Sequence, residues 1–173
     1  WVSWSPYISD VINTASDNYI PDTRLLINSK DTNQLIADTY IVRSDLLADK
    51  PEMMQTFVEC MIEGSQSIGT KTYNDMASFY GLKSAGEAKS MLDDVHIANF
   101  TESKMFFDDA NPIGASKIFY LAQEYYKQLG ALPASASYDP ERVYSDKILS
   151  AIDKKGLYSN QKNVMLDSFN KKA

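Results

Sequence analysis

The only histidine, His96, would have to serve as the general base of any serine or cysteine nucleophile in this chain. No nucleophile-elbow motif of the Gly-x-Ser-x-Gly type accompanies it. His96 follows Asp93 and Asp94 at the end of a predicted helix, where the helix dipole favours a histidine. The spacing of these three residues matches no zinc or calcium pattern. We therefore expect neither a catalytic residue nor a metal site.

Two other features could carry chemistry, and each has a simpler structural interpretation. Cys60, the single cysteine, shares a helical stripe with Phe57, so we expect a buried and unreactive thiol. The adjacent pair Asp108-Asp109 is typical of a solvated loop, because a carboxylate dyad needs a partner in space. The seven glycines are scattered and form no phosphate-binding loop, so we expect no cofactor.

Composition indicates an ordinary globular protein and argues against one class of partner. The chain has 173 residues, a net charge of −6 and a pI of about 4.8. Nucleic-acid binding needs a clustered basic surface to neutralise phosphates, and no basic run exceeds two residues. We therefore expect no nucleic-acid partner. No window is apolar over enough residues to predict a transmembrane helix.

Aromatic and polar groups gather near the start of the chain, in Trp4-Ser5-Pro6-Tyr7. The apolar run over residues 1–4 predicts the end of a strand, and Pro6 prevents its continuation in a central position. Ligands in open α/β sheets bind at the carboxyl ends of strands, so Trp4 is a candidate ligand contact. The alternative is that Trp4 fills the core between the sheet and the first helix, and the residues leave both possibilities open.

Strand-like segments occur only before residue 44. Leu25–Ile27 and Thr39–Val42 are short apolar or β-branched runs that predict two further strands. Three short strands make a marginal sheet. We therefore expect partner strands from outside this chain.

The rest of the chain has helical periodicity. Pro51 and Gly64 bound one predicted helix, and Ser84-Ala85-Gly86-Glu87 is a capping box that begins another. Further helices are predicted over 70–80, 115–129 and from Ser145 to Gly156, and the tail from Tyr158 is expected to be mobile or weakly docked. The predicted inward faces are Met54, Phe57, Val58, Met61 and Ile62 in the first helix, and Ile118, Leu121, Ala122, Tyr125 and Leu129 in the helix over 115–129.

The order of these motifs resembles a known family. Trp4-Ser5-Pro6 resembles the Trp-x-Pro signature of periplasmic solute-binding proteins of ABC transporters of the nitrate, taurine and sulfonate type. The segments Asp38–Arg43 and Asp49-Lys50-Pro51-Glu52 follow in the family's order, and the likeness covers residues 1–155. The segments 32–38 and 161–163 resemble a phosphate-type substrate-binding subgroup, some members of which are fused to OmpA-like domains.

This resemblance implies an α/β fold, part of the type II periplasmic-binding-protein fold, with few strands before a mostly helical C-terminal portion. The chain would be the C-terminal half of such a protein, and its N-terminal half would be a partner. Residues 1–36 would then end the second lobe, 37–155 would hold the crossing strand and helices, and 156–173 would be a tail.

The resemblance also implies ligand contacts. Trp4, Ser5 and Asp38 match cleft-facing positions of the family. An anionic ligand would favour an arginine fork, for which Arg24 and Arg43 lie nearest to the cleft-forming segments. The ligand-binding set expected on this basis is Trp4, Ser5, Tyr7, Asp38, Thr39 and Arg43.

The implied function is binding of a small polar or anionic solute between two lobes, for transport or sensing in the periplasm or cell envelope. An ABC permease or another envelope component would be the partner, and no enzymatic activity is expected. The alternative is a non-transport structural module of the envelope with a vestigial binding lobe. An enzyme of the related thiamin-pyrimidine synthase type is disfavoured, because His96 and Cys60 lie in no matching motif.

Overall fold

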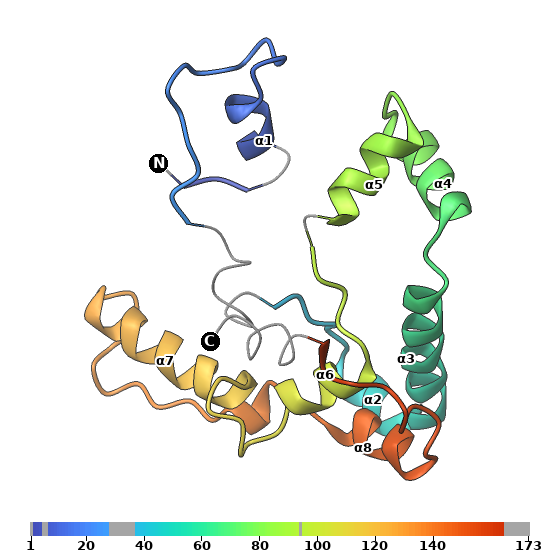
Figure 1. The fold of residues 1–173 in the computed structure, drawn as a ribbon. Coiled ribbons are helices and arrows are strands. Elements are labelled where there is room, and N and C mark those ends of the chain that lie inside the picture. The colour runs from blue at the N-terminus through green and yellow to red at the C-terminus, as the bar shows by residue number, and fades with distance from the viewer. Residues whose placement is uncertain (1, 5–6, 28–36, 94, 165–173) are drawn as a thin grey trace. The chain divides into compact units, whose positions relative to one another are not determined.

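The computed structural model describes residues 2–4, 7–27, 37–93 and 95–164. The chain divides into two compact units, one formed by residues 1–31 and 65–97 and the other by residues 32–64 and 98–173. Figure 1 shows the elements as helices joined by loops. None of the helices in the described ranges combines the length and the apolar character that crossing a membrane requires.

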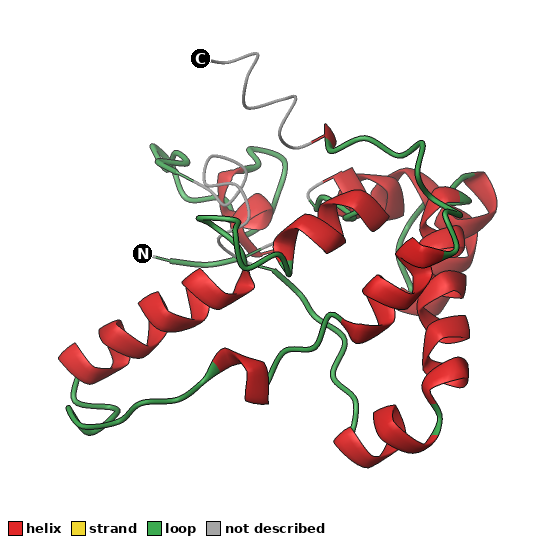
Figure 2. Ribbon diagram, turned by 90° about the horizontal axis from the view of Figure 1, so that it is seen from below, coloured by secondary structure: helices red, strands yellow, loops and turns green. Residues whose placement is uncertain are grey.

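The predicted α/β class is wrong. Figure 2 shows helices and loops throughout the described chain, with no strand. The predicted strands over 1–4, Leu25–Ile27 and Thr39–Val42 are not formed, wherever the structure describes these residues. A strand exists only through hydrogen bonds to a neighbouring strand, and the described residues provide none. A type II periplasmic-binding-protein fold needs a central sheet, so that assignment is overturned with the class.

The core of the second unit lies where three helices and one tyrosine meet. Ile62 of α3 (Pro51–Gln66), Phe100 of α6 (Phe100–Phe106), Ile152 of α8 (Lys147–Lys154) and Tyr158 are all buried and pack together. The Phe100 and Tyr158 rings lie 5.3 Å apart between centroids. Ile152 is fully buried, which makes it the centre of this cluster.

Helix α3 begins at Pro51 as predicted, because a proline at the first helical position loses no intrahelical hydrogen bond. Its predicted inward face is only partly correct. Val58 and Ile62 face the core, whereas Phe57 and Met61 are 43% and 39% exposed. Cys60 is also exposed, so the prediction of a buried thiol is wrong. The physical reason is that α6 and α8 cover a narrower stripe of α3 than its apolar residues span.

Helix α7 (Ala115–Gln128) is where predicted, and its predicted inward face is only partly correct, because Ile118 and Ala122 are half-buried. Leu121, Tyr125 and Leu129 are 47%, 56% and 78% exposed, although their spacing predicted burial. The side that packs instead carries Ala115 and Gln123, which face the chain around η1 (Pro140–Arg142). The side-chain Oε1 of the buried Gln123 accepts the Tyr138 N–H at 2.6 Å, which fixes this loop on α7.

The segment after α8 is more firmly packed than predicted. Tyr158 is part of the core, and the chain that follows it is hydrogen-bonded to the start of α6. Gln161 accepts the Phe100 N–H through its side chain and the Thr101 hydroxyl through its carbonyl oxygen. Residues 158–164 therefore form a docked strap, and the expectation of a loose tail is wrong for them.

The first unit contains α1 (Tyr7–Ile12), α4 (Thr70–Tyr80) and α5 (Ala85–Asp93). Helices α4 and α5 pack against each other, and Ala88 is fully buried. Gly81 ends α4 with a φ of 65°, a conformation that glycine adopts without strain. Ser84 accepts the Glu87 N–H as predicted, whereas the Glu87 carboxylate accepts the N–H of Lys83, one residue earlier than a standard capping box. The remaining helix, α2 (Ser44–Asp49), belongs to the second unit.

Candidate functional site

An exposed aromatic pair stands at the start of α1. The Trp4 carbonyl accepts the Ile8 N–H at 3.2 Å, so Trp4 sits one turn before the helix and Tyr7 opens it. The two rings are nearly perpendicular, at 85°, with centroids 5.9 Å apart. Trp4 is 70% exposed and Tyr7 is 59% exposed. We call this the Trp4–Tyr7 surface; its two rings contact each other and leave most of their area for a ligand.

A hydrogen-bonded loop supports α1 from the other end. The Asp10 carboxylate accepts hydrogen bonds from the Ser16 hydroxyl and from the Asn18 amide, the latter at 2.6 Å. The Ile20 N–H donates to the Val11 carbonyl at 3.0 Å, which closes the loop onto the helix. A six-residue helix is marginal by itself, so these bonds hold the backbone that carries Tyr7.

Asp10 is ionised at neutral pH. The hydrogen bond from Ser16, and then that from Asn18, hold the pKa of its carboxyl below the ordinary value of 3.8. Asp10 lies three residues after Tyr7 and therefore on the same side of α1. The Trp4–Tyr7 surface consequently has a negative charge one helical turn away.

The other predicted contacts lie in the second unit, on the extended chain that leads into α2. Asp38 and Thr39 are exposed, and Tyr40 packs edge-to-face on Phe57 of α3, with centroids 5.6 Å apart. Arg43 precedes α2 and makes a bidentate ion pair with Asp45, from Nε to Oδ1 at 3.0 Å and from Nη2 to Oδ2 at 2.6 Å. The pKa of Asp45 is lowered chiefly by this hydrogen bonding from Arg43.

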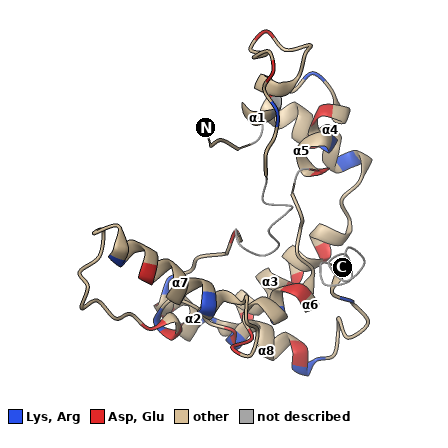
Figure 3. Ribbon diagram, turned by 60° about the vertical axis from the view of Figure 1, so that its left-hand side comes forward, with Lys and Arg blue, Asp and Glu red and all other residues tan. Residues whose placement is uncertain are grey.

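This pairing weakens the case for an anion site at Arg43. A shallow groove beside α2 is lined by Arg43, Asp45, Leu46, Asp49 and Lys50. Its two basic and two acidic side chains balance, and the arginine fork is already filled by Asp45. Acidic and basic residues are interspersed on the helices of this unit (Figure 3). The groove therefore offers a carboxylate or phosphate ligand little net attraction.

The predicted ligand set is thus divided by the structure. Trp4 and Tyr7 are brought together in the first unit, whereas Asp38, Thr39 and Arg43 belong to the second. Ser5 lies outside the described residues. The other candidate arginine, Arg24, is exposed on the chain that follows the α1 loop.

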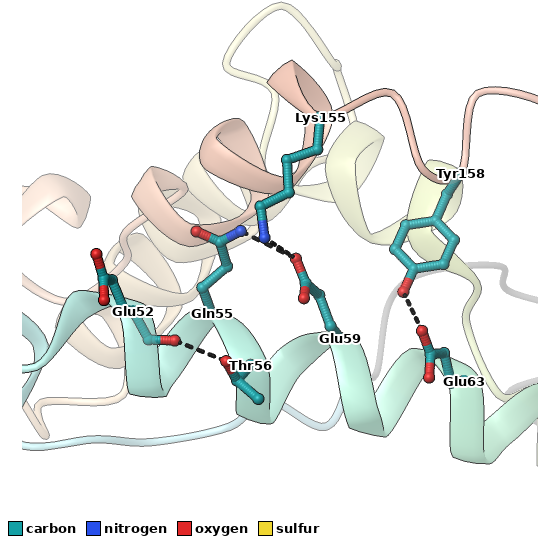
Figure 4. A network of polar contacts seen from close by, with 7 residues as sticks. All are labelled: Glu52, Gln55, Thr56, Glu59, Glu63, Lys155 and Tyr158. Atoms are coloured by element: carbon teal, nitrogen blue, oxygen red, sulfur yellow. Dashed lines mark hydrogen bonds and ion pairs between the residues drawn. The ribbon is translucent and has the colours of Figure 1, made fainter.

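Polar side chains also gather between α3 and the end of α8, and Figure 4 shows them from close by. Glu59 accepts hydrogen bonds from Lys155 at 2.8 Å and from Gln55 at 2.9 Å. The contact with Lys155 is the main reason why the pKa of Glu59 is lowered. The Tyr158 hydroxyl donates to Glu63 at 3.4 Å. These contacts join elements of one core, and we assign them a structural role.

Sequence reasoning missed one buried acid, Glu102. It is 3% exposed, and its carboxylate accepts the N–H groups of Asn99 and Val164, each at 2.9 Å. The Asn99 side chain in turn accepts the Glu102 N–H at 3.0 Å. The Asn-x-x-Glu spacing was a visible signal, because it is a capping-box pattern. The hydrogen bond from the Val164 N–H to Glu102, which holds the strap 158–164, is a tertiary contact that no local pattern shows.

The other acidic candidates have structural partners. Asp108 accepts the Ala110 N–H at 2.9 Å, and Asp109 accepts the Ser116 hydroxyl at 2.6 Å, so both stabilise the turn between α6 and α7. His96 follows α5 in a loop, close to the helix end where it was expected. Among the described residues, no three His, Cys, Asp or Glu side chains are grouped so as to hold a metal ion.

Comparisons with protein-family models, with curated proteins and with solved structures found no match to this chain.

Proposed function

We propose that this chain is a non-catalytic binding module that takes up a small polar solute at the Trp4–Tyr7 surface. The observation that carries the proposal is the exposure of two contacting aromatic side chains, 70% for Trp4 and 59% for Tyr7, at the start of a helix held by its own loop. Two perpendicular rings provide stacking faces, an indole N–H and a phenol hydroxyl, groups that orient small ligands.

The family resemblance supports the same role and extends it. Trp4-Ser5-Pro6 resembles the Trp-x-Pro signature of solute-binding proteins of ABC transporters. On this proposal the protein acts in the periplasm or cell envelope and delivers its solute to a permease, or senses it. The helices predicted from Pro51 onward are present, with α6 in addition, whereas the described ranges have no sheet that would place Trp4 at a strand end.

The proposal is tested with a Trp1→Phe protein, in which Trp4 is the only tryptophan. Its fluorescence is titrated with inorganic phosphate, sulfate, nitrate, taurine, choline and glucose. We expect a saturable change with at least one of these solutes, and its loss in a Tyr7→Leu variant. A matched control is Leu129→Ala, which alters an exposed apolar residue of α7 and should leave binding unchanged. Unchanged Trp4 fluorescence with every solute would refute the proposal.

A second candidate function is favoured by α7. Leu121, Tyr125 and Leu129 form one stripe along this helix and remain substantially exposed. Contiguous exposed apolar surface is typical of protein–protein interfaces, and aromatic residues are enriched there. This observation suits the alternative of a structural module in the envelope that binds another polypeptide.

Photocrosslinking separates the two functions. A photoreactive amino acid at position 125 should give a discrete crosslinked product if α7 binds a polypeptide. The same group at position 124, an exposed glutamate of α7 about 100° around the helix from Tyr125, is the control. Equal crosslinking from both positions would argue against a specific interface on α7.

A further inference from the structure

We propose that the ligand of the Trp4–Tyr7 surface is a small organic cation, of the alkylammonium class, rather than an anion. This inference rests on the proposed function and adds the charge class of its solute. Two aromatic rings at 85° with centroids 5.9 Å apart form two adjacent walls of a corner. The faces of aromatic rings are electron-rich, and Trp and Tyr bind a cation within about 6 Å of the ring centroid.

The charges around the rings favour the same class. Residues 2–27 carry three carboxylates, on Asp10, Asp17 and Asp22, against the single guanidinium of Arg24. Asp10 lies one helical turn from Tyr7, and its hydrogen bonds from Ser16 and Asn18 keep it ionised. A carboxylate beside an aromatic face attracts a cation and repels an anion, and this selects between solutes of equal size.

Arg43, which was one reason to expect an anionic ligand, does not conflict with a cationic one. Arg43 belongs to the other unit, and both of its hydrogen-bonding nitrogens in the ion pair face Asp45. An anion bound there would have to displace a carboxylate already held at 2.6 Å. The remaining candidate site is the Trp4–Tyr7 surface, where the aromatic faces and the nearby Asp10 carboxylate both favour a cation.

The test compares choline with its uncharged isostere dimethylbutanol, in the Trp1→Phe protein, by titration of Trp4 fluorescence. We expect choline to bind roughly three- to thirtyfold more tightly than the isostere, the range of a cation–π contact between exposed and desolvated sites. Tetramethylammonium should bind like choline, and taurine and sulfate should bind more weakly than either.

Three variants assign the effect to residues. Tyr7→Phe keeps the ring and should keep choline binding, whereas Tyr7→Leu should abolish it. Asp10→Asn should weaken choline roughly two- to fivefold, as expected for one nearby charge in water, and leave dimethylbutanol unchanged. The matched control is Asp22→Asn, which removes the same charge at a position with a φ of 62° that asparagine tolerates.

The outcomes distinguish this inference from the function on which it rests. Equal affinity for choline and dimethylbutanol, or tighter binding of taurine, sulfate or glucose, overturns the cation class and leaves solute binding intact. No response to any of these solutes overturns both. An equal loss of choline binding in Asp22→Asn and Asp10→Asn would show a diffuse acidic attraction, and that overturns the role assigned to Asp10.

Discussion

Trp4 contributes to the surface of the protein more than to its core, because 70% of it is exposed and its ring packs against Tyr7. We therefore expect Trp4→Ala to lower the free energy of unfolding by about 0.5–1.5 kcal/mol, the range of one aromatic pair. Deletion of a buried tryptophan costs roughly 3–5 kcal/mol. Urea unfolding measures the difference, and a loss in the higher range would place Trp4 in a core.

Asp10 should make the α1 loop sensitive to acid. Its folded pKa lies below its ordinary value of 3.8, because Ser16 and Asn18 donate hydrogen bonds to the carboxylate. A lowered folded pKa gives stability that is complete above the unfolded pKa and is lost as pH falls through the folded pKa. The stability difference between the native protein and Asp10→Asn should thus be largest near neutral pH and close below about pH 4.

Chemical denaturation at neutral pH and at about pH 3 measures this convergence. Asp17→Asn is the control, since it removes an exposed carboxylate of the same loop. A stability difference for Asp10→Asn that stays constant across this range would mean that its carboxylate is not held by the loop.

At the scale of elements, two glycines make a matched pair. A Cβ on Gly114, just before α7, would lie 2.8 Å from the Phe106 carbonyl oxygen and 3.1 Å from that of Asp108, so the backbone must shift. Gly64 lies within α3, and a Cβ there would meet no atom within 4 Å. Close packing explains the glycine at 114, whereas space is free at 64.

We expect opposite effects from these two positions. Gly114→Ala should destabilise the protein by roughly 1–3 kcal/mol, the usual cost of overpacking. Gly64→Ala should stabilise it by up to about 1 kcal/mol, because alanine loses less entropy in a helix. Thermal or urea unfolding of both variants measures this contrast. A stabilising Gly114→Ala would show that the turn between α6 and α7 is looser than described.

For the molecule as a whole, the clearest test concerns its class. The described residues contain helices and no strand, so the far-ultraviolet circular dichroism spectrum should show the paired minima of α-helix. A temperature scan should reduce both minima together as the helices melt. A spectrum dominated by the single minimum of a β-sheet would contradict this fold.

Local residue patterns predicted several helix boundaries, although α3 runs past its predicted end at Gly64 to Gln66. Pro51 starts α3, and Gly81, Gly130 and Gly156 follow helices with positive φ, because caps depend on residues only a few positions apart. The spacing Asn99-x-x-Glu102 is local information of the same kind, because it is the pattern of a capping box. Periodicity likewise predicted that α7 exists.

Tertiary structure decided which side of each helix is buried. The surface that packs on α7 covers only part of its apolar stripe, so Leu129 is exposed. Gln123 is buried instead, because the loop that carries Tyr138 lies on its side of the helix. On α3, Cys60 is exposed because packing there also covers only part of the apolar stripe. The run Thr39–Val42 has the composition of a strand, but a strand needs a partner from elsewhere in space, and composition cannot supply one. Pairing and burial are non-local, which is why only the folded chain fixes them.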